Sequence, residues 1–243
     1  MIITIVDNYD EMSSKAATIV IKQIHDKPDS VLGLAAGNTP LGMYKELVGA
    51  YEKGDVDFSG TTLFSLDEYC NLDKDNPHSY HYFMHKNFIS RINVKSENVF
   101  LPNGMATDFD EECRYYDKMI EEKGGIDLQI LGIGRNGHIG FNEPGSDFET
   151  KTHLVKLKQS TVDANAGFFH SRDEVPTTAI SMGIKTIRHA RMLLLLANGE
   201  RKAEAIYKTV KGKVTEEVPA SIIQLHPNAV LIIEKNAAKL IEY

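Results

Sequence analysis

The stretch DLQILGIGRNGHIGFNEPGS, residues 127–146, decides the predicted fold. It begins with a short apolar run, residues 127–133, of the kind that forms a strand buried on both faces. Four glycines, at positions 132, 134, 137 and 140, then surround His138, and an Asn-Glu-Pro sequence follows. Glycines let a backbone turn tightly and approach a ligand closely, at an entropic cost that a plain connector need not bear. The stretch therefore predicts a buried strand that ends in a ligand site.

Similar short runs of β-branched residues and leucine recur along the chain, separated by stretches of helical periodicity. Strands that alternate with helices predict a parallel, doubly wound sheet with helices on both faces, a Rossmann-like α/β fold. We expect one domain over residues 1–243, with an irregular lid at about residues 148–186. The predicted strands are residues 1–6, 30–35, 61–66, 127–133, 191–197 and 229–234, and the predicted helices are residues 8–27, 40–53, 108–125 and 199–212.

Charge and composition exclude several classes of protein. The chain of 243 residues has a net charge of −7, which disfavours a nucleic-acid surface and indicates that any anionic ligand is bound by local groups. The N-terminus lacks the basic and long apolar regions of a signal peptide, and the longest apolar stretch, residues 190–197, is too short to span a bilayer. The two cysteines, Cys70 and Cys113, have no paired spacing, which favours a reducing compartment. We expect a cytoplasmic protein without membrane or nucleic-acid partners.

Ligands of doubly wound folds bind beyond the carboxyl ends of the strands, where this chain has three groups of polar residues. In the first group Gly37, Asn38 and Thr39 precede Pro40, which suits the first turn of a helix. The N–H groups of a helix N-terminus bind anions, so this loop predicts a phosphate site. A plain strand-to-helix turn is the alternative.

The second group is Asp67 and Glu68, directly after the strand predicted over residues 61–66. One carboxylate is expected to face the ligand crevice while the other points elsewhere. A carboxylate at the end of a strand is well placed to act as a general base. An acid that caps a helix or braces a loop is the alternative.

The third group is His138 with Asn136 and Glu143 on either side. The pKa of imidazole lies near neutrality, so His138 can both accept and donate a proton. A carboxylate such as Glu143 can fix the histidine tautomer and favour the imidazolium, while Asn136 can hold a ring N–H or a sugar hydroxyl. A structural histidine in a turn is the alternative.

A further cluster, His78, His81 and His85, resembles part of a metal site, but it lacks the glutamate of the HExxH motif. A structural role, or a role at the rim of the site, is the simpler interpretation. We therefore do not expect a metal ion at this cluster.

The three groups, taken with VPTTAISMGIKTI (175–187) and PASIIQLHPNAVLI (219–232), resemble the glucosamine-6-phosphate deaminase/isomerase family over essentially the whole chain. The stretch GIGRNGHIGFNEP, residues 132–144, carries the resemblance most specifically. The related 6-phosphogluconolactonases share the fold but continue differently after the histidine. The resemblance implies conversion of glucosamine 6-phosphate and water to fructose 6-phosphate and ammonia, without a cofactor.

Residue roles follow from the resemblance by position. Asp67 matches the base that moves a proton between C2 and C1 of the substrate, and His138 matches the residue that assists ring opening. Asn136 and Glu143 match the partners of that histidine. The loop Ala36–Gly37–Asn38–Thr39 and Lys202 match the phosphate-binding residues.

The chain departs from the family pattern around the phosphate and the lid. Gly167 stands where many relatives have a phosphate-binding arginine, Ala36 where a threonine is common, and His153 where an arginine is frequent. Asn136 replaces an aspartate found in some members, which leaves Glu143 to stabilise a histidine cation. Either Arg172, Lys151 or His153 replaces the missing arginine, or the phosphate is held more weakly, or the substrate differs.

Other functions are compatible with the same pattern. Galactosamine 6-phosphate is the alternative substrate, and a sugar-phosphate sensor without catalysis is a further possibility. The absence of a basic helix-turn-helix segment disfavours the sensor. Because the chain ends at KLIEY (239–243), without the longer tail of allosteric hexamers, we expect a monomer or a small homo-oligomer.

Overall fold

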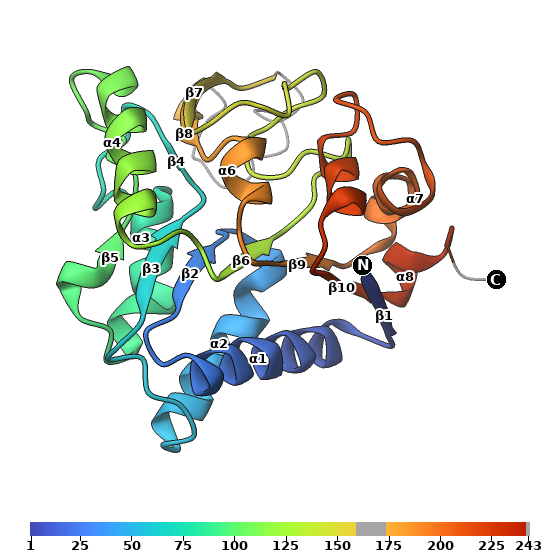
Figure 1. Ribbon diagram of the computed structural model, residues 1–243, viewed down its shortest axis with the longest axis horizontal. Coiled ribbons are helices and arrows are strands. Elements are labelled where there is room, and N and C mark those ends of the chain that lie inside the picture. Colours follow the sequence, from blue (N-terminus) through green and yellow to red (C-terminus); the bar gives the residue numbers. More distant parts are fainter. Residues whose placement is uncertain (159–173, 242–243) are drawn as a thin grey trace.

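A sheet of seven parallel strands forms the centre of the computed structural model, which describes residues 1–158 and 174–241. The strand order is β1-β10-β9-β6-β2-β3-β5 (Figure 1). All six strands expected from the sequence are present, and the short edge strand β5 is an addition to them. The strands are β1 (Ile2–Val6), β2 (Val31–Leu34), β3 (Thr62–Ser65), β5 (Val99–Phe100), β6 (Leu128–Leu131), β9 (Met192–Ala197) and β10 (Ala229–Glu234).

Helices cover both faces of this sheet, as expected for a doubly wound fold: α1 (Tyr9–Asp26) and α2 (Asn38–Glu52) lie on one face, and α6 (Ile184–Arg188) and α7 (Ala203–Lys211) lie on the other (Figure 1). No helix within residues 1–158 and 174–241 is long and apolar enough to cross a membrane. The remaining helices are α3 (Tyr80–Asn87), α4 (Phe109–Glu122) and α8 (Lys235–Ala238), with 3₁₀ turns at η1 (Ile89–Arg91), η2 (Ser96–Asn98), η5 (Glu200–Lys202) and η6 (Pro219–Leu225).

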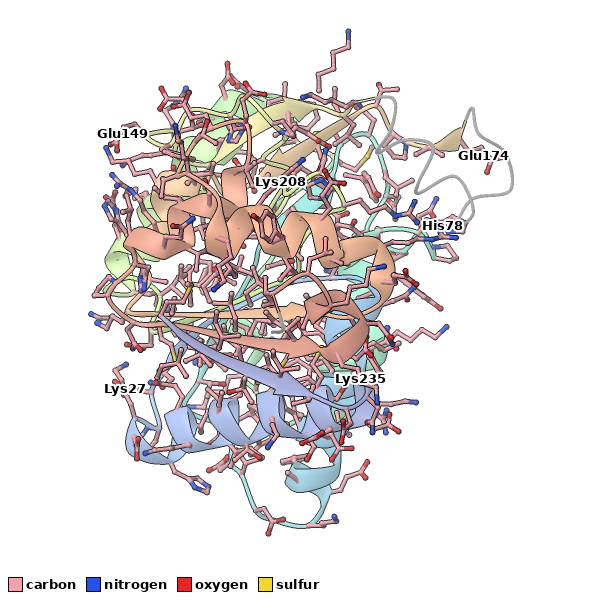
Figure 2. The ribbon with its side chains drawn as sticks, turned by 90° about the vertical axis from the view of Figure 1, so that its right-hand side faces the viewer. Lys27, His78, Glu149, Glu174, Lys208 and Lys235 are labelled. Carbon is pink, nitrogen blue, oxygen red and sulfur yellow. The ribbon has the colours of Figure 1, made fainter. Side chains whose placement is uncertain are left out.

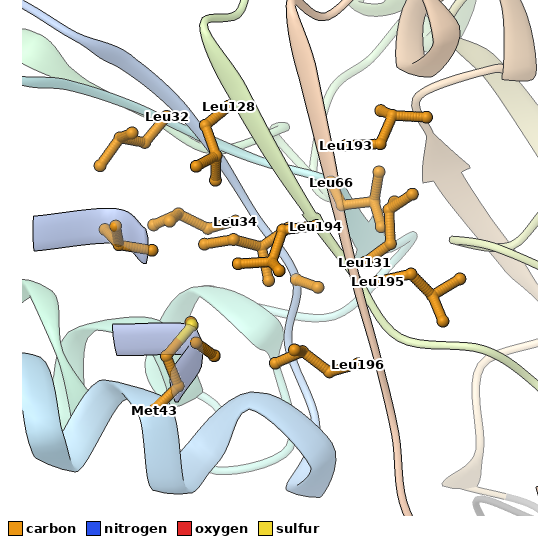
Figure 3. Packing of buried hydrophobic residues seen from close by; sticks show 14 of the residues in the cluster. Leu32, Leu34, Met43, Leu66, Leu128, Leu131, Leu193, Leu194, Leu195 and Leu196 are labelled. Carbon is orange, nitrogen blue, oxygen red and sulfur yellow. The ribbon is translucent and has the colours of Figure 1, made fainter. Parts of the chain in front are cut away.

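The core consists mainly of aliphatic side chains from the central strands. In β9 the four consecutive leucines 193–196 are all fully buried, because α-helices cover both faces of the sheet. Leu34 of β2 and Leu194 of β9 pack in the same layer, with Met43 of α2 beneath them (Figure 3). Each such buried side chain contributes about 1.5–3 kcal/mol relative to an exposed one.

A second, antiparallel sheet in the order β4-β8-β7 was not expected from the sequence. Its strands are β4 (Asp67–Tyr69), β7 (His153–Lys156) and β8 (Thr178–Ser181), so part of the segment expected to be an irregular lid is regular and paired. These strands have only three or four residues and little alternation, so their pairing depends on tertiary contacts more than on local pattern. The rest of the expected lid, residues 159–173, lies outside the described residues.

The two ends of the central sheet are built differently. At the amino ends, the buried carboxylate of Asp127 accepts hydrogen bonds from the Val31 N–H (2.7 Å), the Lys27 ammonium (2.9 Å) and the Arg191 guanidinium (2.9 Å). The loops at the carboxyl ends carry the polar groups singled out in the sequence. Lys27 and His78, which lie at opposite ends of the strands, are found on opposite sides of the molecule (Figure 2).

Candidate active site

A cavity of about 970 Å³ opens at the carboxyl ends of β2, β3, β6 and β9. Its volume is in the range of small-molecule sites. All site residues expected from the sequence line the cavity except Glu143, which lies behind it and is 5% exposed. The residues that line it are Ala36, Gly37, Asn38, Thr39, Asp67, Asn136, His138 and Lys202.

The loop after β2 places the N-terminus of α2 at the cavity. Gly37 precedes the helix with a φ of 104°, which a residue with a side chain rarely adopts. The helix begins at Asn38, so Pro40 is its third residue rather than its first; proline is tolerated there because N–H groups of the first turn have no partner within a helix. No described side chain caps this N-terminus. Its N–H groups are therefore available to an anion in the cavity.

Asp67 is the first residue of β4 and is 6% exposed. Burial, together with the neighbouring Glu68 carboxylate, raises the pKa of Asp67 to about 8. Among the described residues no donor is hydrogen-bonded to its carboxylate. Tyr80 and Phe141, whose rings stack at 5.9 Å, line the same cavity and limit the access of water. Asp67 is thus a poorly solvated carboxylate, which takes up a proton more readily than an exposed one.

Glu68 has a different role from its neighbour. Its buried carboxylate accepts hydrogen bonds from the N–H groups of Tyr69 (2.8 Å), Tyr80 (2.9 Å) and His81 (2.6 Å). The last two groups belong to the first turn of α3, so Glu68 fixes the start of that helix beside the cavity. Successive residues of a strand point to opposite sides. As expected from the sequence, one carboxylate, Asp67, lines the cavity and the other, Glu68, points elsewhere.

The loop after β6 packs the imidazole ring of His138 against the backbone of Gly134, four residues earlier in the same loop. The N–H of Gly134 donates to the His138 carbonyl at 2.9 Å, and a Cβ built on Gly134 would lie 2.2 Å from Cε1 of the His138 ring. Only glycine fits at position 134 without movement of the ring. The His138 side chain is 25% exposed and lines the cavity.

Asn136 and Glu143 contact each other and support His138 in different ways. The Asn136 Nδ2 donates to the Glu143 Oε2 at 2.6 Å, and the Asn136 Oδ1 accepts from the backbone N–H of His138 at 3.2 Å. Nδ1 of the His138 ring lies 3.7 Å from the same Glu143 Oε2 and is buried without a hydrogen-bond partner among the described residues. Glu143 therefore faces the ring, whereas Asn136 orients the backbone of His138 and not its imidazole.

Lys202 brings positive charge to the cavity. Its Nζ donates to the Ile133 carbonyl at 2.5 Å. Burial, and next the charge of Arg135, lower the pKa of Lys202 to about 8. Arg135 and Arg201 also line the cavity, and neither was expected from the sequence. The position of Arg135 within the glycine-rich loop was the available signal.

A side-chain hydrogen bond joins the loops after β2 and β9. The Thr39 hydroxyl donates to Asn198 Oδ1 at 3.1 Å, and Asn198 lines the cavity without having been expected from the sequence. This contact links the loops after β2 and β9, and the hydrogen bond from Lys202 to Ile133 links the loops after β9 and β6, so all three loops border the same cavity.

The residues considered as replacements for the missing arginine lie elsewhere. Lys151 pairs with Glu121 at 2.9 Å, and the His153 Nδ1 lies 3.0 Å from the Lys151 carbonyl. Neither residue lines the cavity formed by the described residues, which argues against Lys151 and against His153 as the cation that replaces the arginine. Gly167 and Arg172 lie outside the described residues.

The histidine cluster is consistent with a structural or rim position. The rings of His81 and His85 stack at 4.5 Å, and burial lowers the pKa of both. His78 lies at the cavity wall. Residues 1–158 and 174–241 contain no group of three or more His, Cys, Asp or Glu side chains that could hold a metal ion.

Comparisons with known proteins agree with this arrangement. Residues 7–232 match the family model described as glucosamine-6-phosphate isomerases/6-phosphogluconolactonase. The chain is 58% identical over 241 residues to the glucosamine-6-phosphate deaminase of Thermoanaerobacter pseudethanolicus, covering 99% of this chain and 94% of that protein. It is 56% identical over 241 residues to the enzyme of the same name from Clostridium acetobutylicum, covering 99% of this chain and 100% of that protein.

Solved structures support the same relationship. A structure described as a monomeric glucosamine-6-phosphate deaminase matches with a TM-score of 0.97 and 44% identity, covering 99% of this chain and 100% of that chain. The 6-phosphogluconolactonase from Thermotoga maritima shares the fold, with a TM-score of 0.76 and 18% identity over 96% of this chain and 99% of that one. The protein therefore belongs to the glucosamine-6-phosphate isomerase/6-phosphogluconolactonase family.

Proposed function

We propose that this protein converts glucosamine 6-phosphate and water to fructose 6-phosphate and ammonia. The observation that carries the proposal is the meeting of a buried carboxylate, Asp67, and His138 in one cavity with an open helix N-terminus and Lys202. The relatives named as deaminases of this substrate, 56–58% identical over nearly the whole chain, support it.

The phosphate group of the substrate occupies the end of the cavity between the loop 36–39 and Lys202. N–H groups of the first turn of α2 donate to its oxygens, and the ammonium of Lys202 adds a charge-assisted hydrogen bond. A fixed phosphate orients the sugar toward the catalytic groups, so that binding energy from a non-reacting group assists the reaction.

His138 opens the pyranose ring. Ring opening removes a proton from the hydroxyl on C1, delivers a proton to the ring oxygen and breaks the bond between C1 and that oxygen. One imidazole can perform both transfers because it accepts and donates near neutral pH. The carboxylate of Glu143, 3.7 Å from Nδ1 of His138, stabilises the imidazolium that forms between the two steps.

Asp67 then moves a proton along the open-chain sugar. The aldehyde at C1 acidifies the hydrogen on C2, and the Asp67 carboxylate removes this proton while the C1 oxygen takes up a proton from water, which leaves an enol amine. The same group returns the proton to C1, which produces an imine at C2. Water adds to this imine and ammonia leaves, giving the ketone of fructose 6-phosphate. A base with a raised pKa of about 8 is suited to removing a carbon-bound proton.

Ammonia release from glucosamine 6-phosphate, with galactosamine 6-phosphate assayed in parallel, tests the proposal. We expect release from the gluco substrate and a loss of about 10²–10⁴-fold in kcat for Asp67→Asn, the usual contribution of a general base. The matched control is Asp55→Asn, which removes an exposed carboxylate outside the cavity. A preference for the galacto epimer would reassign the substrate, and a folded protein that is inactive on both sugars would contradict the proposal.

We further propose that the enzyme acts in the cytoplasm as a monomer or a small homo-oligomer. The 44% identical structure described as a monomeric deaminase supports the simpler of these states. Light scattering across a range of protein concentrations distinguishes them.

A further inference from the structure

Positive charge is concentrated on one wall of the cavity although the chain as a whole is acidic, with a net charge of −7. Arg135, Arg201 and Lys202 all line this wall. Glu200, which also lines it, forms an ion pair with Lys239, the residue after α8, and so is partnered by a cation from outside the cavity. The other acid at the cavity is Asp67, whose raised pKa of about 8 leaves much of it uncharged at neutral pH.

Arg135 and Lys202 are held near each other by the backbone. Lys202 donates to the carbonyl of Ile133, which lies two residues before Arg135 in the same loop. The positive charge of Arg135 repels that of the Lys202 ammonium and so contributes to the lowered pKa of Lys202. Like charges this close are unfavourable in a free protein and become favourable when an anion binds between them.

Arg135 differs from most other arginines of the described chain in its partners. Arg188 pairs with Glu149, Arg191 with Asp127 at 2.9 Å, and Arg91 with Glu52 at 3.6 Å. Among the described residues no carboxylate forms an ion pair with Arg135, whose exposed side chain is directed to the cavity wall. Its guanidinium is therefore available to a ligand.

We propose that Arg135 binds the phosphate group of the substrate together with Lys202. A guanidinium offers paired N–H donors that match two phosphate oxygens, while Lys202 supplies a point charge. The identity of the sugar in this assignment rests on the proposed function. The assignment of Arg135 to an anion site does not depend on it. It gives the phosphate a guanidinium partner although Gly167 stands where the family pattern has an arginine and Lys151 and His153 lie outside the cavity.

The test measures two quantities, the KM for glucosamine 6-phosphate and the dissociation constant for inorganic phosphate. The variants are Arg135→Ala, Arg135→Lys and, as a matched control, Arg91→Ala, which removes an exposed arginine outside the cavity. We expect Arg135→Ala to raise both constants about 10- to 100-fold, the usual loss for a charge-assisted hydrogen bond, with kcat changed less than about threefold. Arg135→Lys should recover part of the loss, and Arg91→Ala should match the wild type.

The outcomes separate this inference from the proposed function. Unchanged KM and phosphate affinity in Arg135→Ala would overturn the inference while ammonia release by the wild type still supported the function. A wild type that releases no ammonia but binds inorganic phosphate through Arg135 would overturn the proposed function and still support the anion site. A loss in Arg201→Ala with none in Arg135→Ala would assign the phosphate to the other arginine and overturn the inference.

Discussion

The imidazole of His138 lies directly against the backbone of Gly134. A Cβ at position 134 would be 2.2 Å from Cε1 of the ring, and the Gly134 N–H donates to the His138 carbonyl at 2.9 Å. Gly134 thus determines the position of the His138 imidazole, the proposed ring-opening group, and this contact gives a steric reason for a glycine at position 134.

We expect Gly134→Ala to displace the His138 ring and to lower kcat at least about tenfold, part of the 10²–10⁴-fold that general acid–base catalysis provides. The matched control is Gly49→Ala on α2, where no atom lies within 4 Å of the added Cβ. This control should keep full activity and gain roughly 0.5–1 kcal/mol in stability. Unchanged kcat in Gly134→Ala would show that the ring position is not critical.

Asp67→Asn is expected to stabilise the fold while it removes activity. The pKa of Asp67 rises from 3.8 to about 8 on folding, so between these values the native state binds more protons and stability falls as pH rises. Because each pKa unit corresponds to about 1.4 kcal/mol and the new amide needs partners, we expect a gain of about 1–3 kcal/mol at pH 8. Urea unfolding at pH 4 and pH 8 measures it, and an equal change at both values would refute the linkage.

Phosphate affinity is expected to decrease above the pKa of Lys202, which is about 8. The ammonium that binds phosphate loses its proton there, so affinity should fall by up to about tenfold per pH unit. Lys202→Arg stays charged and should remove this dependence. Calorimetric titration of inorganic phosphate between pH 7 and 9.5 measures both proteins, with Lys208→Arg on α7 as the control. A persistent fall in Lys202→Arg would point to another titrating group.

Glu68→Gln should shift the activity profile to lower pH. The Glu68 carboxylate contributes to the raised pKa of Asp67, so its neutral replacement lowers that pKa and ionises the proposed base earlier. The same change weakens hydrogen bonds to the start of α3 and should cost about 1–3 kcal/mol. Profiles of kcat/KM against pH and thermal unfolding give the two readouts. If the acid limb of the kcat/KM profile stays at the same pH in Glu68→Gln, Glu68 carries no charge in the wild type over that pH range.

Glu143→Gln should lower kcat roughly 10- to 100-fold, a fraction of the usual general acid–base contribution, and leave KM within about threefold. The amide oxygen can still accept from Asn136, but it no longer stabilises a His138 cation. KM is spared because Glu143 does not line the cavity. Steady-state kinetics beside an exposed control, Glu97→Gln, test this, and a rise in KM alone would instead place Glu143 in substrate binding.

Part of this site is predictable from the amino-acid sequence. The loop 36–39, Asp67 and His138 stand directly after apolar runs, and the carboxyl ends of parallel strands meet at one edge of a sheet. Asn198 also follows an apolar run and Arg135 lies within the glycine-rich loop, but a single polar residue in a loop has no pattern that shows whether its side chain lines a cavity. Their importance arises from folding, which brings the charge of Arg135 near Lys202 and places Asn198 within hydrogen-bond distance of Thr39.

The sequence by itself determined six of the seven strands of the main sheet and their succession along the chain, since continuous apolar runs such as the leucines 193–196 are typical of strands covered on both faces. Tertiary structure alone decided the β4-β8-β7 sheet and the burial that raises the pKa of Asp67. The physical reason is the sequence separation over which each interaction acts. Hydrophobic periodicity acts between neighbours in the chain, whereas the pairing of short strands and the desolvation of a carboxylate depend on segments that meet only when the chain has folded.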